Sequence, residues 1–175
     1  MSSLLKHTNK MKNREKPNDV VYTPYNVAIK LIEMSEINDT DIVLDPSRGK
    51  GIFYNNLPTN NKDWCEITEG VDFFQYDKPC DVIIGNPPFS LWTDWIKHTI
   101  KLNPSKICYI IGALNLTPLR MQLLQDAGYA LTKLHMVTIK DWFARTYLVV
   151  YEKNKQDIIT FDRKYYHPDK DIIEL

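Results

Sequence analysis

The sequence lacks the features that mark several classes of protein. Its only cysteines are Cys65, Cys80 and Cys108, and no two are spaced as Cys-x-x-Cys. This argues against a disulfide framework or a metal site and favours a reducing compartment. No apolar run is long enough for a transmembrane helix, and no signal peptide is recognisable. We therefore expect an intracellular protein that does not associate with membranes.

An excess of charge of one sign is also lacking. The chain has 22 basic residues (Lys and Arg) and 22 acidic ones, so its formal net charge is +0, and any surface that binds a polyanion must be local. The 175 residues fit a single domain, and we find no linker or internal repeat. Residues 1–18 form a basic stretch that we interpret as a flexible arm, either simply solvated or following phosphates.

Buried strands and amphipathic helices are predicted to alternate along the chain. We expect strands at 41–44, 64–67, 81–85, 107–111, 131–139 and 147–151. We expect helices after Thr23 as N-cap, over Ile52 to Leu57, over 91–102 with His98 on its polar face, and from Pro118 to the stop at Gly128. This alternation predicts an α/β fold with a doubly wound parallel sheet.

The most informative stretch is Asn86-Pro87-Pro88-Phe89, directly after the β-branched run 81–85. The two prolines fix φ and remove two backbone donors. The Asn86 side chain and the Pro87 carbonyl are then two acceptors at the carboxyl end of a buried strand, where ligands of such sheets bind. They suit a planar –NH2 group, and Phe89 offers a flat face to a base. The alternative is a proline-rich turn after a core strand.

A second stretch, from Asp45 to Gly51, follows the first strand. Its glycines let the backbone approach a ligand closely, but the spacing fits neither Gly-x-x-x-x-Gly-Lys-Ser/Thr nor Gly-x-Gly-x-x-Gly. Arg48 and Lys50 could reach a ligand carboxylate or a substrate phosphate. Glu66 lies where an acid binds ribose hydroxyls in nucleotide-binding units, although a solvated carboxylate at a strand end is the alternative.

These stretches occur in the order of a known set of motifs. Tyr-Thr-Pro, Asp-Pro-x-x-Gly-x-Gly, Asp-Phe and Asn-Pro-Pro-Phe together resemble the S-adenosylmethionine-dependent amino methyltransferases, chiefly the adenine-N6 enzymes that act on DNA or RNA. The resemblance covers roughly residues 22–151, with 152–175 left as a tail. It implies a class I, Rossmann-like methyltransferase domain whose mostly parallel seven-stranded sheet has an antiparallel last strand.

The resemblance also implies roles for individual residues. The segment Tyr22, Thr23 and Pro24 would close over the methionine half of the cofactor, and Asp72 with Phe73 would bind its adenine, although a turn Asp with core aromatics is the alternative for this pair. The full set implied to bind the cofactor is Tyr22, Thr23, Pro24, Asp45, Pro46, Gly49, Gly51, Glu66, Asp72, Phe73 and Asn86. The implied catalytic set is Asn86, Pro87, Pro88 and Phe89.

The loop between the last two predicted strands is implied to bind substrate. In adenine-N6 enzymes this loop often supplies a second aromatic against the target base. Phe143 is our candidate, Trp142 competes with it, and Arg145 could meet a phosphate. An exposed hairpin tip is the alternative.

We therefore expect a methyltransferase that uses S-adenosylmethionine to modify the N6 amino group of adenine in DNA. Methylation of RNA, N4-cytosine methylation, N5-glutamine methylation of protein and an inactive cofactor-binding subunit of a larger complex are the alternatives. The sequence shows no separate target-recognition domain, so we expect recognition to come from short loops, a homodimer or a partner subunit.

Overall fold

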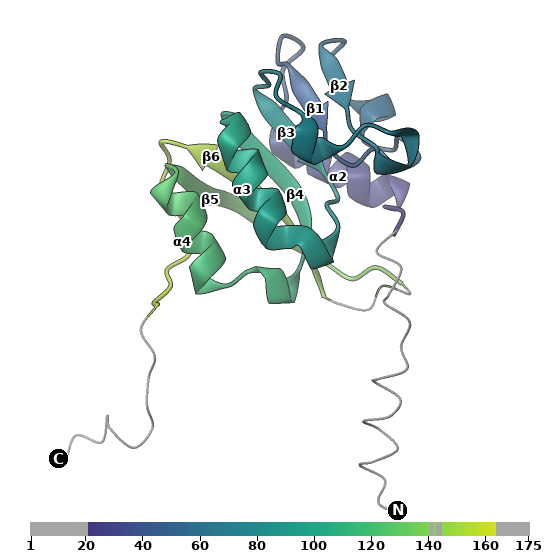
Figure 1. Ribbon diagram of the computed structural model, residues 1–175. Helices are drawn as coiled ribbons and strands as arrows, with labels where there is room; N and C mark the ends of the chain where they lie inside the picture. Colours follow the sequence, from purple (N-terminus) through teal and green to yellow (C-terminus); the bar gives the residue numbers. More distant parts are fainter. Residues whose placement is uncertain (1–20, 141, 143–144, 164–175) are drawn as a thin grey trace, which may run out of the picture.

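The computed structural model describes residues 21–140, 142 and 145–163, and these form one sheet with helices on both faces (Figure 1). The predicted basic arm at 1–18 lies outside the described residues. The sheet has the strand order β2-β1-β3-β4-β6-β5. Its strands are β1 (Val43–Asp45), β2 (Lys62–Trp64), β3 (Val82–Gly85), β4 (Lys106–Gly112), β5 (Tyr129–Val137) and β6 (Thr146–Lys153).

Strands β2, β1, β3 and β4 are parallel, whereas β6 is antiparallel to both of its neighbours. The mostly parallel sheet with an antiparallel last strand is thereby confirmed. Six strands are present among the described residues rather than the predicted seven. Between β2 and β3 the chain forms only two short turns, η2 (Ile67–Glu69) and η3 (Phe73–Gln75), because this segment is too short for a crossover helix and a further strand.

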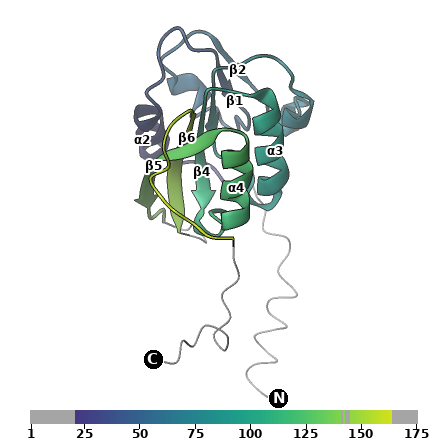
Figure 2. The same ribbon diagram turned by 90° about the vertical axis from the view of Figure 1, so that its left-hand side faces the viewer.

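The helices enclose the sheet from both sides, as a doubly wound fold requires. Helix α2 (Tyr25–Ser35) covers one face, and α3 (Trp92–Leu102) and α4 (Pro118–Asp126) cover the other (Figure 2). Strand β4 shows how the core is divided, since alternate residues pack into different layers. Ile107, Tyr109 and Ile111 join the layer that includes α3 and α4, and Cys108 and Ile110 join the layer under α2.

Two lysines hold the carboxyl end of α2 against the sheet. Lys133 on β5 donates to the Met34 carbonyl at 2.8 Å, and Lys106 on β4 donates to the Ser35 carbonyl. Cations at this position also interact favourably with the helix dipole. The docking matters for function because the segment just before α2 reaches the site described below.

Several predicted element boundaries are wrong. Pro24, not Thr23, is the N-cap of α2, and it makes no side-chain cap. Only a 3₁₀ turn, η1 (Tyr54–Asn56), forms where a helix was predicted over Ile52 to Leu57, since neighbouring asparagines and a proline disfavour helix. The second strand is Lys62–Trp64 and ends before Glu66.

His98 was predicted on the polar face of α3, but it is buried. Its Nε2 lies 3.1 Å from the Tyr76 carbonyl, and its ring packs edge-on against Phe73. A hydrogen bond of this kind compensates for burying the imidazole. The alternation of charged residues along α3 could not reveal this partner, which comes from a distant turn.

Part of the predicted tail belongs to the fold. Strand β6 extends to Lys153, and the following residues return along β5, where Ile158 donates its backbone N–H to the Leu131 carbonyl at 3.0 Å. Asp157 accepts from the Leu131 backbone N–H and from Gln125 Nε2, both at 2.6 Å. This segment lies along part of the outer edge of β5, which limits the exposed pairing groups of an edge strand.

Two further observations concern the described part of the chain. The three cysteine thiols are buried and none forms a disulfide. No helix there has both the length and the apolar character needed to cross a membrane.

The role of Asp157 can be tested by substitution. Asp157→Ala should lower the free energy of unfolding by about 2 kcal/mol, because two charge-assisted hydrogen bonds are lost and one buried backbone donor loses its partner. Asp94→Ala is the control, since Asp94 is exposed and pairs only with Lys97 at 3.7 Å, and such pairs contribute about 0–1 kcal/mol. Urea unfolding measures both, and equal losses would contradict the assignment.

Candidate functional site

Asn86 lies at the carboxyl end of β3, where three separate segments of the chain meet. Its Nδ2 donates to the Val21 carbonyl at 3.2 Å. A carbonyl can only accept, so this contact fixes the nitrogen toward Val21 and turns Oδ1 the other way. Oδ1 is buried and has no hydrogen-bond partner among the described residues. An unpartnered buried acceptor is costly in a folded protein and calls for an explanation.

The loop after β1 packs directly against the Asn86 segment. Ser47 Oγ donates to the Asn86 carbonyl at 3.1 Å. Gly85 permits this approach, because a Cβ at that position would lie 3.2 Å from Pro46 Cδ and 3.3 Å from Asp45 Oδ1. The two stretches singled out in the sequence are therefore brought together by the pairing of β1 with β3. Ser47 was missed as a site residue because the resemblance leaves its position variable.

The loop itself depends on glycine at two positions. Gly49 has φ +51° and Gly51 has φ +79°, values that residues with a Cβ adopt reluctantly. The ring of Tyr22 lies across Gly49, 3.9 Å from the point where a Cβ would stand. The Lys50 ammonium lies 4.2 Å from the centroid of that ring. The segment before α2 thus covers the glycine loop.

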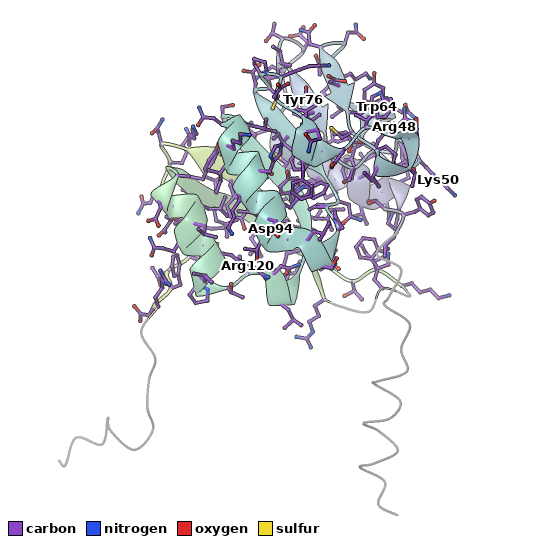
Figure 3. All side chains as sticks on the ribbon, in the orientation of Figure 1. Arg48, Lys50, Trp64, Tyr76, Asp94 and Arg120 are labelled. Carbon is purple, nitrogen blue, oxygen red and sulfur yellow. The ribbon has the colours of Figure 1, made fainter. Side chains whose placement is uncertain are left out.

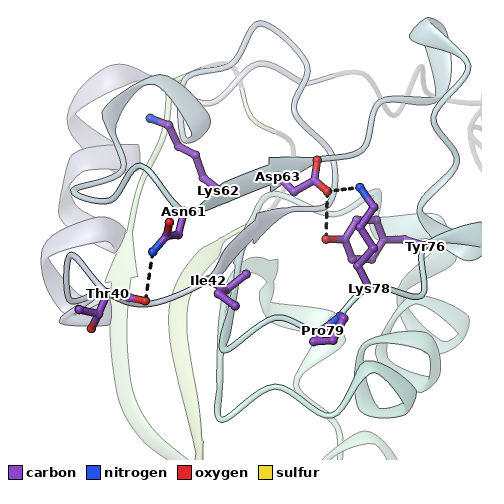
Figure 4. A pocket seen from close by; sticks show the side chains of 8 residues that line it. All are labelled: Thr40, Ile42, Asn61, Lys62, Asp63, Tyr76, Lys78 and Pro79. Atoms are coloured by element: carbon purple, nitrogen blue, oxygen red, sulfur yellow. Dashed lines mark hydrogen bonds and ion pairs between the residues drawn. The ribbon is translucent and has the colours of Figure 1, made fainter.

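A cavity of about 170 Å³ lies between this covering segment and the loop. Predicted residues that line it are Tyr22, Thr23, Gly49 and Asn86, and Ser47, Arg48 and Lys50 line it too. Pro24, Pro46, Gly51, Glu66, Asp72 and Phe73 are not among its lining residues. A larger cleft of about 480 Å³ lies at the opposite end of the strands, where Asp63 accepts from Lys78 and Tyr76 (Figure 4), and it contains none of the predicted site residues.

Asp45 lies beneath the loop, fully buried, and does not line the cavity. Burial raises its pKa to about 7, although backbone N–H groups of Ser47 and Tyr54, each at 3.3 Å, oppose the rise. A carboxylate without a cationic partner is unfavourable in such a place. A cation bound in the cavity above would favour its ionised form.

Glu66 contacts the loop, but in this structure its carboxylate is already engaged. Oε2 accepts from the Gly49 backbone N–H at 2.7 Å, and Oε1 accepts from Thr68 N and Oγ1 at 3.1 and 2.7 Å. Burial would raise its pKa, but these hydrogen bonds and the nearby Arg48 outweigh it and lower the pKa. A ribose would have to share this carboxylate with the loop.

Arg48 belongs to the same loop, and its side chain anchors the loop to neighbouring residues. Its guanidinium lies 3.9 Å from the Trp64 ring centroid and pairs with Glu69 (Figure 3). Its Nε is buried without a hydrogen-bond partner among the described residues. The sequence left open whether Arg48 meets a ligand carboxylate or a phosphate, and the structure shows its terminal nitrogen bound to the protein instead.

Asp72 and Phe73 have the turn and core environments that the sequence left open as the alternative to cofactor binding. Asp72 caps η3 by accepting the Phe74 backbone N–H at 3.0 Å. The Phe73 ring is 2% exposed and packs 4.4 Å from Trp95, centroid to centroid. It lies in the core, so its face is not available to a ligand.

Phe89 of the Asn-Pro-Pro-Phe motif and Trp142 of the loop before β6 contact each other, although they lie far apart in the sequence. Phe89, half-buried in η4 (Phe89–Leu91), packs edge-to-face on Trp142 with ring centroids 6.4 Å apart. Arg145 is exposed, and its carbonyl accepts the Ala113 backbone N–H at 2.8 Å, at the end of β4. Phe143, the predicted substrate aromatic, lies outside the described residues. Among those described, no cluster of His, Cys, Asp or Glu could hold a metal ion.

No protein-family model and no curated protein matches the sequence. Solved structures do match its fold. Magnesium protoporphyrin IX methyltransferase from Synechocystis, with bound SAM, has a TM-score of 0.59 at 11% identity, over 87% of this chain and 92% of that one. A dimethyladenosine transferase from Plasmodium falciparum has 0.56 at 16% identity, over 76% and 63%. The M protein of the type I restriction enzyme EcoKI has 0.60 at 11% identity, over 86% and 47%.

The fold is that of the class I methyltransferases. At such identities the likeness concerns the backbone alone. The Rossmann-like arrangement agrees with the sequence-based expectation, and the strand count is the difference between them.

The raised pKa of Asp45 makes stability depend on pH. The folded pKa of about 7 exceeds the ordinary 3.8, so the unfolded chain loses this proton first and stability falls as pH rises from about 4 to 7. Relative to Asp45→Asn, which cannot ionise, the wild type should lose about 2 kcal/mol between roughly pH 5 and pH 8. Asp77→Asn, at an exposed position, is the matched control. Urea unfolding curves that stay parallel in pH for wild type and Asp45→Asn would contradict the burial argument.

Proposed function

We propose that this protein uses S-adenosylmethionine to methylate the N6 amino group of adenine in DNA. The observation that carries the proposal is the buried Asn86 Oδ1, which lacks a hydrogen-bond partner among the described residues while its Nδ2 is held by Val21. Such an oxygen is an acceptor held ready for an incoming N–H. An exocyclic amino group supplies one, together with a planar ring for the adjacent Phe89.

The cavity supports the identity of the cofactor. It lies over the glycine loop, its size suits the amino-acid end of the molecule, and Asp45 beneath it favours a cationic group above. Tyr22, Thr23 and Gly49 would hold this end, and Lys50 stands beside Tyr22 where a carboxylate can be met. When bound, S-adenosylmethionine supplies an electrophilic methyl group on its sulfonium. The structure of the Synechocystis enzyme of the same fold contains it.

Asn86 and Pro87 would orient the amino group. Two acceptors in the plane of the N–H bonds would fix the amino group so that its lone pair, which is perpendicular to that plane, faces the methyl donor. Positive charge would develop on the nitrogen as it takes up the methyl group and the carbon–sulfur bond of the cofactor breaks, and the carbonyl dipoles of Asn86 and Pro87 would stabilise this charge without reorganising. Holding the reactants in place supplies a further part of the rate. The N6 proton leaves after the bond has formed, so no strong base is required beforehand.

The surroundings favour a nucleobase over a protein amide. Phe89 and Trp142 offer two aromatic rings whose planes are inclined at 73° to each other, which suits a base taken out of its stack. The exposed Arg145 near this end of β4 suits a backbone phosphate. A glutamine side chain would use neither. The motif resemblance is to enzymes that act on DNA or RNA, and we take DNA as the substrate; a homodimer or partner subunit would supply target recognition beyond these loops.

Asn86→Ala tests the proposal directly. Methyl transfer from labelled S-adenosylmethionine to duplex DNA should fall by a factor of about 100 or more, the loss typical of removing one such stabilising dipole. Digestion of the labelled DNA to nucleosides and mass spectrometry should identify N6-methyladenine as the wild-type product.

A measurement of cofactor binding shows whether activity lost in Asn86→Ala is lost in the chemical step or through misfolding. Asn86→Ala should bind S-adenosylmethionine within a few-fold of wild type by calorimetry, and the exposed Asn60→Ala should keep full activity. Label in RNA or protein instead of DNA would replace the substrate in the proposal. Cofactor binding without transfer to any polymer would favour an inactive subunit.

The affinity for S-adenosylmethionine should also depend on pH. Asp45, with a pKa of about 7, is neutral below that pH and attracts the cofactor's ammonium only once ionised. The dissociation constant should therefore fall as pH rises from about 5.5 to 7.5. Because Asp45 loses its proton when the cofactor binds, the buffer should take up a proton on binding. Calorimetry in two buffers of different ionisation enthalpy measures both effects. Asp45→Asn should flatten the profile, and an unchanged slope in this variant would assign it to another group.

A further inference from the structure

One exposed leucine, Leu114, lies in a turn that side-chain hydrogen bonds anchor to a helix. Leu114 is 87% exposed and lies in η5 (Ala113–Asn115), the 3₁₀ turn that follows β4. Single exposed apolar side chains are common and need no explanation by themselves. What distinguishes Leu114 is the anchor of its turn.

Arg120, in the first turns of α4, provides that anchor. Its Nη1 donates to the Leu114 carbonyl at 3.3 Å and to Asn115 Oδ1 at 2.7 Å. Its Nε donates to Thr93 Oγ1 at 3.3 Å, near the start of α3. Figure 3 shows Arg120 between the two helices, at the end of the molecule where η5 lies. The turn that carries Leu114 is therefore fixed to the helix that begins just after the Asn86 motif.

The register of the sheet places Leu114 relative to Asn86. Gly85 pairs with Tyr109, so Asn86 lies level with Ile110, and Leu114 follows four residues later. At about 3.3 Å per residue, the offset along the strand direction is at most about 13 Å. One stretch of nucleic acid can contact both residues, with the exposed Arg145 beside η5 for its phosphates.

We propose that Leu114 enters the base stack of the DNA substrate at the place that the target adenine leaves, and that Arg120 is the positioning residue that holds it there. The proposal rests on the proposed function. An adenine that reaches Asn86 must leave its stack, and the gap behind it is unfavourable unless something fills it. DNA-bending proteins insert apolar side chains such as leucine between base steps, and a turn that is already anchored presents such a side chain with less loss of backbone entropy.

The test compares paired with unpaired substrate. We would measure KM for methyl transfer to two substrates. One is a short duplex in which adenine occurs beside every combination of neighbouring bases, and the other is a single strand of that duplex. Leu114→Ala should raise the duplex KM about tenfold, the effect of losing most of a buried leucine contact, and should hardly change the single-strand KM. Leu114→Phe should retain the wild-type duplex KM, because a ring also fills the gap.

Arg120→Ala should show the same selective rise for the duplex, and the double variant should be no worse than the more affected single one. Ile42→Ala is the matched control, because Ile42 is 43% exposed at the opposite end of the sheet, and it should match wild type on both substrates. Urea unfolding of each variant shows whether a loss comes from misfolding.

The outcomes separate the two proposals. A wild type that methylates no DNA overturns the proposed function and this inference with it. A wild type that methylates duplex while Leu114→Ala leaves its KM unchanged overturns the inference alone. An equal rise on duplex and single strand, or activity on single strands only, also overturns it, since Leu114 would then not be filling a gap in paired DNA.

Discussion

The parallel pairing of β1 with β3 is the constraint on which the site depends. It sets the ends of two strands side by side, so the loop from Asp45 and the segment from Asn86 share one small volume. Gly85 leaves room for the contact, and Ser47 joins the two by a hydrogen bond. The other four strands and the helices on both faces bury this pair and hold its geometry. A change in the register of β3 would move Asn86 away from the loop and turn its neighbours to the wrong face.

Polar groups that the fold leaves uncompensated gather at this junction. Within the part of the chain that the structure describes, Asp45 is buried, and burial raises its pKa although Arg48 is close enough to oppose the rise. Asn86 Oδ1 is buried without a donor, and Arg48 Nε is buried without an acceptor. Natural proteins tolerate such local costs mainly where function requires them. Trp95 Nε1, in the core, is a further such atom among the described residues, and there it faces the Tyr109 hydroxyl rather than a site for a ligand.

At two places the structure of the site differs from what the motif resemblance implies. The glycine loop is clamped by Glu66 on its backbone and by Arg48, which is stacked on Trp64 and paired with Glu69. In the proposed site, the adenine end of the cofactor would meet carboxylates that are already engaged and a Phe73 ring that lies in the core. The amino-acid end would meet a cavity that is already formed, so binding at that end would need less rearrangement of the protein.

The sequence by itself determined the class of fold and the residues around Asn86. Continuous apolar runs predict buried strands, and two prolines after a strand end it whatever the surroundings. These are local effects, so the sequence can reveal them. Only the tertiary structure decided that His98 and Phe73 are buried, that Asp157 closes the edge of β5, and that Val21, Ser47 and Arg120 orient Asn86 and η5. Those roles depend on contacts between residues far apart in the chain, and spacing along the sequence carries no record of them.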